Sequence, residues 1–246
     1  MSKRKPVARR RRSAADRLKP FWILLVLFIA VIGLGGYYAA TWPGFRARQI
    51  VVIGNHRVGA KAILHRAAID RRLNIWLQDM RAVADRVAAI PDVGQVTIRR
   101  AFPASVSILV RERHPFASIL SGGKKIVVDH DLRVLDFEAA PTLPQFVVAI
   151  KPLAPGKDVT DERVVRLRDD YDQLEGAHVI VKSMRYDRFG YLIAVTPRGV
   201  QLLLGGDDED LARKISLIGP ILSQVAGKKI AAIDLRAPGT PVVRYK

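Results

Sequence analysis

The stretch that decides the fold is Val93-Gly-Gln-Val-Thr-Ile-Arg-Arg-Ala-Phe-Pro-Ala-Ser-Val-Ser-Ile-Leu-Val-Arg-Glu112. Two runs within it alternate between apolar and polar residues, as strands with one buried face do: Val93 to Arg100 and Ser105 to Glu112. The inward-facing positions are Val96, Ile98, Val106, Ile108 and Val110. Phe102-Pro103 between the runs is typical of a turn, so the stretch predicts a β-hairpin.

The residues before this hairpin predict one strand and two helices. Gln49 to Ile53 is rich in β-branched residues and ends at the turn residues Gly54-Asn55. Ala60 to Ile69 carries apolar residues at helical spacing. A second helix is expected from Asp79, as its N-cap, to Ala89. The order β-α-α-β-β over residues 46–115 suits a small sheet with two helices on one face.

The N-terminal part explains much of the net charge of +18 in this chain of 246 residues. Residues 1–19 form a basic tail, and an uncharged run follows over residues 20–45. The tail is a block of like charge, so we expect it to be disordered in isolation. Phe21 to Ala40 is long and apolar enough for a helix that crosses a bilayer, with Trp22 and Trp42 as interface anchors.

A cleaved signal peptide is the alternative for this segment. Its apolar stretch is longer than usual for a signal peptide, and no cleavage site of small residues is convincing. The basic tail predicts a cytoplasmic N-terminus and places residues 46–246 on the other side of the membrane. The same tail suits anionic lipid headgroups, which makes nucleic acid the weaker interpretation of the charge.

Residues 116–246 predict a second, mainly β domain with flanking helices. Lys124 to Leu135 reads as strand, turn, strand, and a loop-rich stretch broken by prolines follows around Phe146-Val147-Val148. Helices are expected at Val164 to Leu174 and at Leu211 to Val225, the latter kinked or interrupted at Gly219-Pro220 and preceded by an acidic cap at Asp207 to Asp210. Short strands are expected at Val179–Val181, Met184–Tyr186, Tyr191–Thr196 and Val200–Leu204.

The chain ends in a predicted hairpin. Ile230 to Leu235 and Val242 to Tyr245 are strands, and Ala237-Pro-Gly-Thr between them is a turn. The last strand follows Pro241, which cannot donate a ladder hydrogen bond, so the strand suits a sheet edge. An exposed edge leaves N–H and C=O groups unpaired, and a partner can take them up by adding a strand.

The sequence as a whole resembles the FtsQ/DivIB family of bacterial cell-division proteins. The matching pattern comprises Ile53-Gly54-Asn55, Leu73-Asn74-Ile75 with Leu77, Ile90-Pro91-x-Val93, Val96-x-x-Arg99-Arg100-x-x-Pro103 and Glu112-Arg113-x-Pro115-x-Ala117. Asp92 stands where the family usually has a bulky aromatic residue. The resemblance implies an α+β chain: a single transmembrane helix, a POTRA domain (β-α-α-β-β) and a C-terminal β domain.

The resemblance also implies a partner and a place. Ile233-Asp-Leu-Arg236 and Val242-Val-Arg244 are similar to the family's ending, whose last strands receive FtsB bound to FtsL. Arg236 matches a partner-contacting arginine of the family, and Arg188 is a second candidate. The expected partner-binding residues are Arg188, Arg236, Ala237, Gly239, Thr240, Val242, Val243, Arg244 and Tyr245. The implied location is the inner membrane at the division septum, with the C-terminal domains periplasmic and other divisome components as further partners.

The sequence favours binding over catalysis. It has no cysteine, its five histidines are scattered, and it carries no catalytic or phosphate-binding motif, so we expect no cofactor, no metal and no small-molecule substrate. Asp129-His130-Asp131 is the densest candidate for a metal site, but its place in a predicted turn explains the aspartates locally. The alternatives are another POTRA-bearing membrane assembly or translocation factor and a membrane-anchored envelope enzyme.

Overall fold

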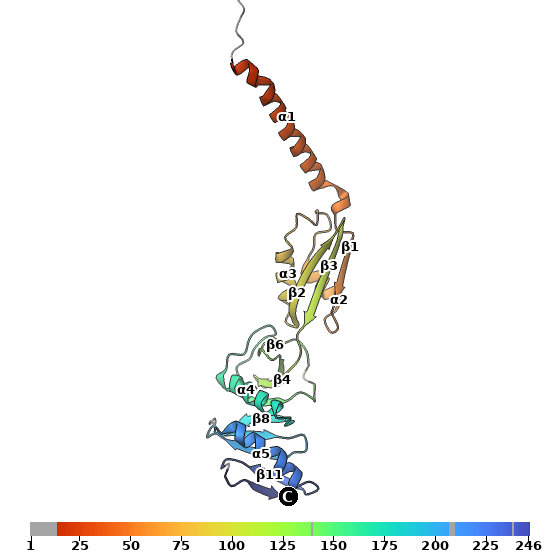
Figure 1. Cartoon of the computed structure of the whole chain (residues 1–246). Coiled ribbons are helices and arrows are strands. Elements are labelled where there is room, and N and C mark those ends of the chain that lie inside the picture. The colour runs from red at the N-terminus through yellow and green to blue at the C-terminus, as the bar shows by residue number, and fades with distance from the viewer. Residues whose placement is uncertain (1–13, 139, 207–209, 238) are drawn as a thin grey trace, which may run out of the picture.

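The computed structural model describes residues 14–138, 140–206, 210–237 and 239–246. Figure 1 shows three parts in a row: the long helix α1, a small sheet with two helices, and a large sheet that contains the C-terminus. This arrangement confirms the α+β class with one N-terminal apolar helix and a C-terminal β sheet.

Helix α1 spans Ala14–Thr41 and contains most of the uncharged run. Its segment Pro20–Thr41 has a mean hydropathy of 2.3 with none of it buried, so it is long and apolar enough to cross a membrane. The helix begins inside the basic tail, so residues 14–19 are helical in this chain, while disorder of the tail in isolation stays a prediction. Residues 1–13 lie outside the described part of the chain. A short 3₁₀ turn, η1 (Pro43–Phe45), leads out of α1.

The small sheet confirms the β-α-α-β-β order. Its elements are β1 (Gln49–Ile53), α2 (Ala60–Ala67), α3 (Met80–Ala88), β2 (Val93–Ala101) and β3 (Ser105–Glu112). The strand order is β1-β3-β2, with β1 parallel and β2 antiparallel to β3. The predicted inward positions Val106, Ile108 and Val110 are buried against Ile63 of α2 and Val83 of α3.

Local chemistry sets the ends of the two helices. Asp79 is the N-cap of α3 and its carboxylate accepts the backbone N–H groups of Arg81 at 2.9 Å and Ala82 at 3.2 Å. Helix α2 ends two residues earlier than predicted, because Ala68 adopts the left-handed conformation with φ 46°.

Glu112, at the end of β3, fastens the turn that follows β1. Its Oε1 accepts the backbone N–H groups of His56 at 2.7 Å, Arg57 at 3.0 Å and Val58 at 2.8 Å. Burial acts to raise the pKa of Glu112, but these three N–H donors outweigh it and lower that pKa. Gly54 begins the turn at φ +87°, where a Cβ would stand 2.3 Å from the carbonyl oxygen of Val110.

The large sheet has nine strands among the described residues, in the order β12-β11-β10-β9-β8-β7-β4-β5-β6. Its strands are β4 (Ala117–Ser121), β5 (Lys124–Val128), β6 (Val134–Leu135), β7 (Gln145–Ile150), β8 (Ser183–Tyr186), β9 (Leu192–Val195), β10 (Gln201–Gly205), β11 (Ile230–Asp234) and β12 (Val242–Tyr245). Helices α4 (Glu162–Gly176) and α5 (Leu211–Gln224) lie along it in Figure 1 and share its apolar core.

The segment around Phe146-Val147-Val148 corrects the prediction of a loop-rich stretch. It is β7, which pairs in parallel with β4 on one side and with β8 on the other, and Phe146 is completely buried. The prolines do not prevent this, because Pro144 precedes the strand and Pro152 follows it. Strand β4 was not predicted at all.

Two other expectations for this domain are wrong. Val179–Val181 is not a strand: the N–H of Val179 donates to Leu174 to close α4, and Ile180 is 74% exposed. Helix α5 continues through Gly219-Pro220, which contradicts the predicted interruption, while the predicted kink stays a prediction. Asp210 is its N-cap but makes no side-chain cap bond; Asp207, Asp208 and Glu209 lie outside the described residues.

Arg113 links the two sheets directly after β3. Its guanidinium pairs with the buried carboxylate of Asp129 through Nη1, and its Nε donates to the carbonyl of Val93 at 3.3 Å. Asp129 also accepts the N–H of Arg133 at 2.8 Å. A second link joins the N–H of Asp136 to the carboxylate of Asp92 at 2.7 Å. These contacts connect the far end of the small sheet to the start of the large one.

Candidate functional site

Strand β12 lies at one end of the large sheet. It pairs antiparallel with β11, with Val242 opposite Asp234 and Arg244 opposite Ala232, and pairs with no other described strand. One side of its backbone therefore has no ladder partner within the described part of the chain. Val242 is 54% exposed and Tyr245 is 51% exposed, so large apolar side chains flank this open edge.

The two faces of β12 differ. Val243 stands opposite the buried Ile233, on the same face as the core that α5 helps to cover. Val242 and Arg244 point to the other face, together with Asp234 of the neighbouring strand, and Nη2 of Arg244 lies 3.6 Å from Oδ2 of Asp234. Near the chain end, Nζ of Lys228 lies 5.4 Å from the ring centre of Tyr245.

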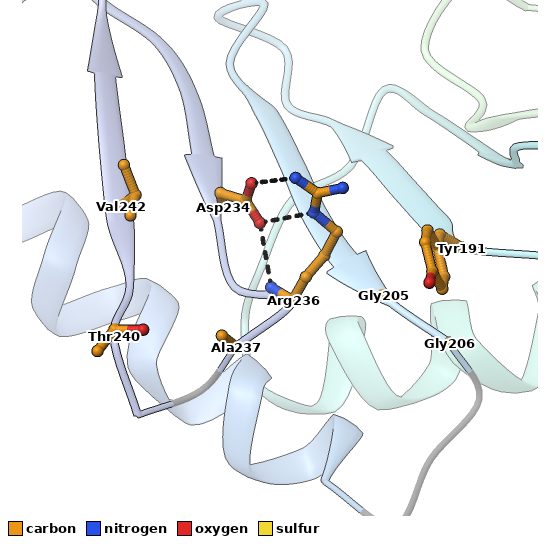
Figure 2. Close-up of a pocket in the computed structure, with 8 residues that line it drawn as sticks. All are labelled: Tyr191, Gly205, Gly206, Asp234, Arg236, Ala237, Thr240 and Val242. Carbon is orange, nitrogen blue, oxygen red and sulfur yellow. Dashed lines mark hydrogen bonds and ion pairs between the residues drawn. The ribbon is translucent and has the colours of Figure 1, made fainter. Parts of the chain in front are cut away.

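A shallow groove of about 570 Å³ opens where β12 begins, and we call it the edge groove. It is lined by Tyr191, Gly205, Gly206, Asp234, Arg236, Ala237, Thr240 and Val242. Strands β10, β11 and β12 each contribute one terminal residue to it, and Tyr191 directly precedes β9. Figure 2 shows the Arg236 guanidinium against the Asp234 carboxylate, with Tyr191 on the opposite side of the groove.

Arg236 is held by an aspartate of its own chain. Its Nε donates to Oδ1 of Asp234 at 2.9 Å and its Nη2 donates to Oδ2 at 2.6 Å, while its backbone N–H also donates to Oδ1 at 3.2 Å. The hydrogen-bonded guanidinium of Arg236 lowers the pKa of Asp234, and the carboxylate in turn raises the pKa of Arg236. The pair fixes the direction in which the arginine points.

This pairing leaves a defined part of the guanidinium for a ligand. Asp234 occupies the edge formed by Nε and Nη2, whereas Nη1 has no hydrogen-bond partner among the described residues, which leaves the edge formed by Nη1 and Nη2 open. A second carboxylate can approach that edge with two parallel hydrogen bonds. The Arg236 side chain is 48% exposed, so it is accessible from solvent.

Arg188 lies in the turn between β8 and β9, at the same end of the sheet. Its guanidinium sits 4.6 Å from the ring centre of Phe189, which is 66% exposed. Asp187 holds the turn by accepting the N–H groups of Tyr191 at 2.9 Å and Phe189 at 2.8 Å, and these bonds lower its pKa. The turn ends at Tyr191, which lines the edge groove.

The structure thus brings the predicted residues to one corner of the sheet. Arg236, Ala237, Thr240 and Val242 line the groove, Gly239 lies in the same turn, Val243, Arg244 and Tyr245 continue along β12, and Arg188 stands on the adjacent turn. Pro238 of the turn lies outside the described residues. Asp234, Tyr191 and Phe189 were missed. The spacing of Asp234 two residues before Arg236 was a usable signal, because residues i and i+2 of a strand share a face.

The other cluster of polar residues has a structural role. Asp129 is engaged by Arg113 and Arg133, and Nε2 of His130 lies 3.1 Å from the carboxylate of Asp172. Among the described residues, no group of three or more His, Cys, Asp or Glu side chains is arranged to hold a metal ion.

Comparison with known proteins gives one match to a domain model and several matches to whole proteins. Residues 45–113 match the model of the POTRA domain of FtsQ type. The chain is 24% identical to the cell division protein FtsQ of Mycobacteroides abscessus over 95% of its own length and 72% of that protein. It is 24% identical to the cell division protein DivIB of Clostridium tetani over 83% of this chain and 81% of the relative.

A further relative matches a smaller part. The chain is 27% identical to the cell division protein FtsQ of Zymomonas mobilis over 51% of its own length and 45% of that protein. The matched region is therefore less than half of this relative.

Proposed function

We propose, on the premise that the chain belongs to the FtsQ/DivIB family, which its POTRA domain and its relatives support, that it binds and localises an FtsB/FtsL-type complex at the division septum. The relatives support a role in the divisome. Binding of the complex would help control septal peptidoglycan synthesis by other proteins. The work of this chain is then protein binding, without catalysis of its own.

The observation that carries the proposal is the open edge of β12. A partner segment that adds a strand there takes up the unpaired N–H and C=O groups and extends the nine-stranded sheet. Main-chain hydrogen bonds of this kind supply affinity, and side chains beside the edge supply specificity. Val242 and Tyr245 offer the apolar contacts, since both are about half exposed.

Arg236 supplies the charge contact in this proposal. Asp234 holds the guanidinium by its Nε and Nη2 edge, so an acidic residue of the partner meets the other edge in a fixed orientation. Arg188 is a second cation at the same corner, with Phe189 and Tyr191 as aromatic contacts. Bitopic division proteins anchored in the same membrane would present such a segment from the same side.

The test is binding of the FtsB/FtsL-type complex to the full chain in lipid nanodiscs. A chain truncated after Arg236 lacks β12 and should lose binding. Arg236→Glu should weaken binding by about 30-fold or more, since loss of one member of a desolvated charge pair costs roughly 2–5 kcal/mol. Arg236→Lys keeps the charge without the planar fork, so its affinity should lie between that of the unchanged chain and that of Arg236→Glu.

The matched control is Arg198→Glu, which reverses an exposed arginine in the turn between β9 and β10 at the other end of the strands. It should bind like the unchanged chain. Retained binding by the truncated chain would refute strand addition, and equal affinities for Arg236→Glu and Arg198→Glu would remove Arg236 from the interface.

The remaining parts of the proposal concern place and orientation. Helix α1 would anchor the chain as a single-pass protein of the cytoplasmic membrane, with its basic tail among anionic headgroups on the cytoplasmic side and both sheets on the other side. The POTRA domain would offer a second docking surface for divisome components. A fluorescent fusion should concentrate at the constriction site, and an even distribution over the membrane would contradict septal recruitment.

A further inference from the structure

The end of the small sheet nearest to α1 exposes a set of large apolar side chains, which we call the proximal apolar set. Its members are Trp42 (52% exposed), Leu73 (55%), Trp76 (41%), Leu77 (70%) and Phe102 (74%). They come from three connections: the exit from α1, the segment between α2 and α3, and the turn between β2 and β3. Contiguous exposed apolar side chains of this size usually mark an interaction surface.

Specific contacts fasten this set to the end of the apolar helix. The side-chain amide of Asn74, which is only 9% exposed, lies within hydrogen-bond distance of the carbonyl oxygens of Ala39 (3.3 Å) and Ala40 (3.4 Å). Those carbonyls belong to the last turn of α1 and have no partner within the helix ladder. The N–H of Ile75 donates to the carbonyl of Phe45 at 2.9 Å, which ties the same segment to the helix exit.

An aromatic row completes the connection. The ring of Phe45 packs edge-on against Trp42, with centres 4.8 Å apart, and against Phe102, with centres 5.9 Å apart. Trp76 donates its indole N–H to the carbonyl of Pro103 at 3.3 Å. These contacts hold the proximal apolar set next to the C-terminal end of α1.

The charge around this set is mainly positive. Exposed arginines stand beside it in the chain: Arg46, Arg48, Arg71, Arg72 and Arg99. The carboxylates nearby in the chain serve local hydrogen bonds, since Asp79 caps α3 and Asp70 accepts the N–H of Arg72 at 2.8 Å. Apolar and aromatic side chains fringed by arginines match the headgroup region of a bilayer, where aromatic rings lie between hydrocarbon and water and arginines reach phosphates.

We propose that this end of the small sheet rests in the phospholipid headgroup region of the membrane that α1 crosses. Continuity with α1 argues for lipid as the occupant: a helix that spans the bilayer ends at its surface, and the set is fastened to that end. The inference rests on α1 being membrane-spanning and is independent of any partner at β12.

The contact has a consequence for the rest of the molecule. A single helix followed by a free linker would leave the folded domains to tilt at random, whereas three membrane-touching connections hold the small sheet against the bilayer. Figure 1 shows the large sheet at the end of the small sheet opposite to α1, where the Arg113 pair with Asp129 joins the two. The edge groove is then presented away from the membrane surface.

The test uses the fact that Trp76 is one of only three tryptophans. The full chain with Trp22→Phe and Trp42→Phe retains Trp76 alone and is reconstituted in vesicles of phosphatidylcholine and phosphatidylglycerol. The emission of Trp76 is compared between plain lipid and lipid whose acyl chains are brominated close to the headgroup. We expect brominated lipid to quench Trp76 several-fold more strongly than a reporter far from the membrane.

That reporter is Phe189→Trp in a chain whose three native tryptophans are changed to phenylalanine, because Phe189 is a 66% exposed aromatic residue of the large sheet. Leu77→Asp and Phe102→Asp together should remove most of the quenching of Trp76. Ile180→Asp, which changes an equally exposed residue in the connection between α4 and β8, should leave the quenching intact.

Equal quenching of Trp76 and the distant reporter would overturn the proposal, as would full quenching in the Leu77→Asp and Phe102→Asp chain. If that double variant unfolds, as judged by its thermal midpoint, Leu77→Asp alone decides between the outcomes, because this 70% exposed side chain contributes little to the core.

Discussion

Replacement of Glu112 by glutamine tests how the small sheet holds the turn after β1. The carboxylate accepts three successive backbone N–H groups, those of His56, Arg57 and Val58, at 2.7–3.0 Å. Hydrogen bonds to a charged acceptor contribute about 1.5–3 kcal/mol each, against about 0.5–1.5 kcal/mol for neutral pairs. Glutamine keeps one acceptor oxygen and turns an amide group toward the remaining donors.

We therefore expect Glu112→Gln to lower the free energy of unfolding of the small sheet by about 2 kcal/mol, with water replacing part of the lost bonding at this partly exposed site. For a domain of this size, 2 kcal/mol corresponds to a fall of roughly 10 °C in the thermal midpoint. The assay is thermal unfolding of the full chain in detergent, followed by Trp76 emission in the Trp22→Phe, Trp42→Phe background. Glu138→Gln, at an exposed position in the connection between β6 and β7, is the control.

The effect should depend on pH with a defined sign. The folded-state pKa of Glu112 is lowered, so its stabilisation is complete above its unfolded-state pKa of about 4.3 and is lost as the pH falls through the folded value. The difference between the wild-type chain and Glu112→Gln should be constant near neutral pH and shrink below about pH 4. Identical midpoints at pH 7, or a difference that grows on acidification, would refute this account.

Three further substitutions test other parts of the structure, each by chemical denaturation of the full chain. Phe146→Ala removes a completely buried ring from β7 and should destabilise the large sheet by about 3–5 kcal/mol; a loss under 1 kcal/mol would contradict a central position. Asp79→Ala removes the N-cap of α3 and should cost about 1 kcal/mol, whereas Asp79→Asn should cost much less. Asp129→Asn weakens the charged pair with Arg113 and should cost about 1–3 kcal/mol, and an unchanged denaturation curve would show that the pair adds no stability.

Local patterns in the sequence were sufficient for the small sheet. The alternation in Val93 to Glu112 reports which face of each strand is buried, and the structure pairs Ile98 with Ile108 in the hairpin this implies. Asp79 worked as a helix signal because its side chain meets N–H groups only two and three residues away. Both signals, strand alternation and the helix N-cap, depend only on residues that are close together in the sequence.

The large sheet was predicted less completely because its pairing is not local. Strand β7 joins β4 and β8 in parallel, and the partners Phe146, Ile119 and Met184 are far apart in the sequence. A short apolar run among prolines carries no local mark of such partners. Conversely, Val179–Val181 has the composition of a strand but pairs with no described strand; Val181 is buried in the core, Val179 packs against it and Ile180 is exposed.

The candidate site also combines residues that the sequence predicted with contacts that only the tertiary structure shows. The run Val242 to Tyr245 was predicted as an edge strand because it ends the chain after a proline, whereas Arg236 was predicted only from the family resemblance. Two features became visible only in the tertiary structure: Asp234 holds Arg236 by one edge of its guanidinium, and the ends of three strands meet Tyr191 in one groove.

The sequence alone determined the apolar helix, the basic tail before it and the β-α-α-β-β order, since charge, length and periodicity are properties of contiguous residues. Tertiary structure decided that Asn74 meets the end of α1, that exposed residues from three connections gather beside it, and that Arg188 and Arg236 share a corner of the large sheet. The physical reason is that these contacts join residues distant in the chain, and only the packing of whole elements brings them together.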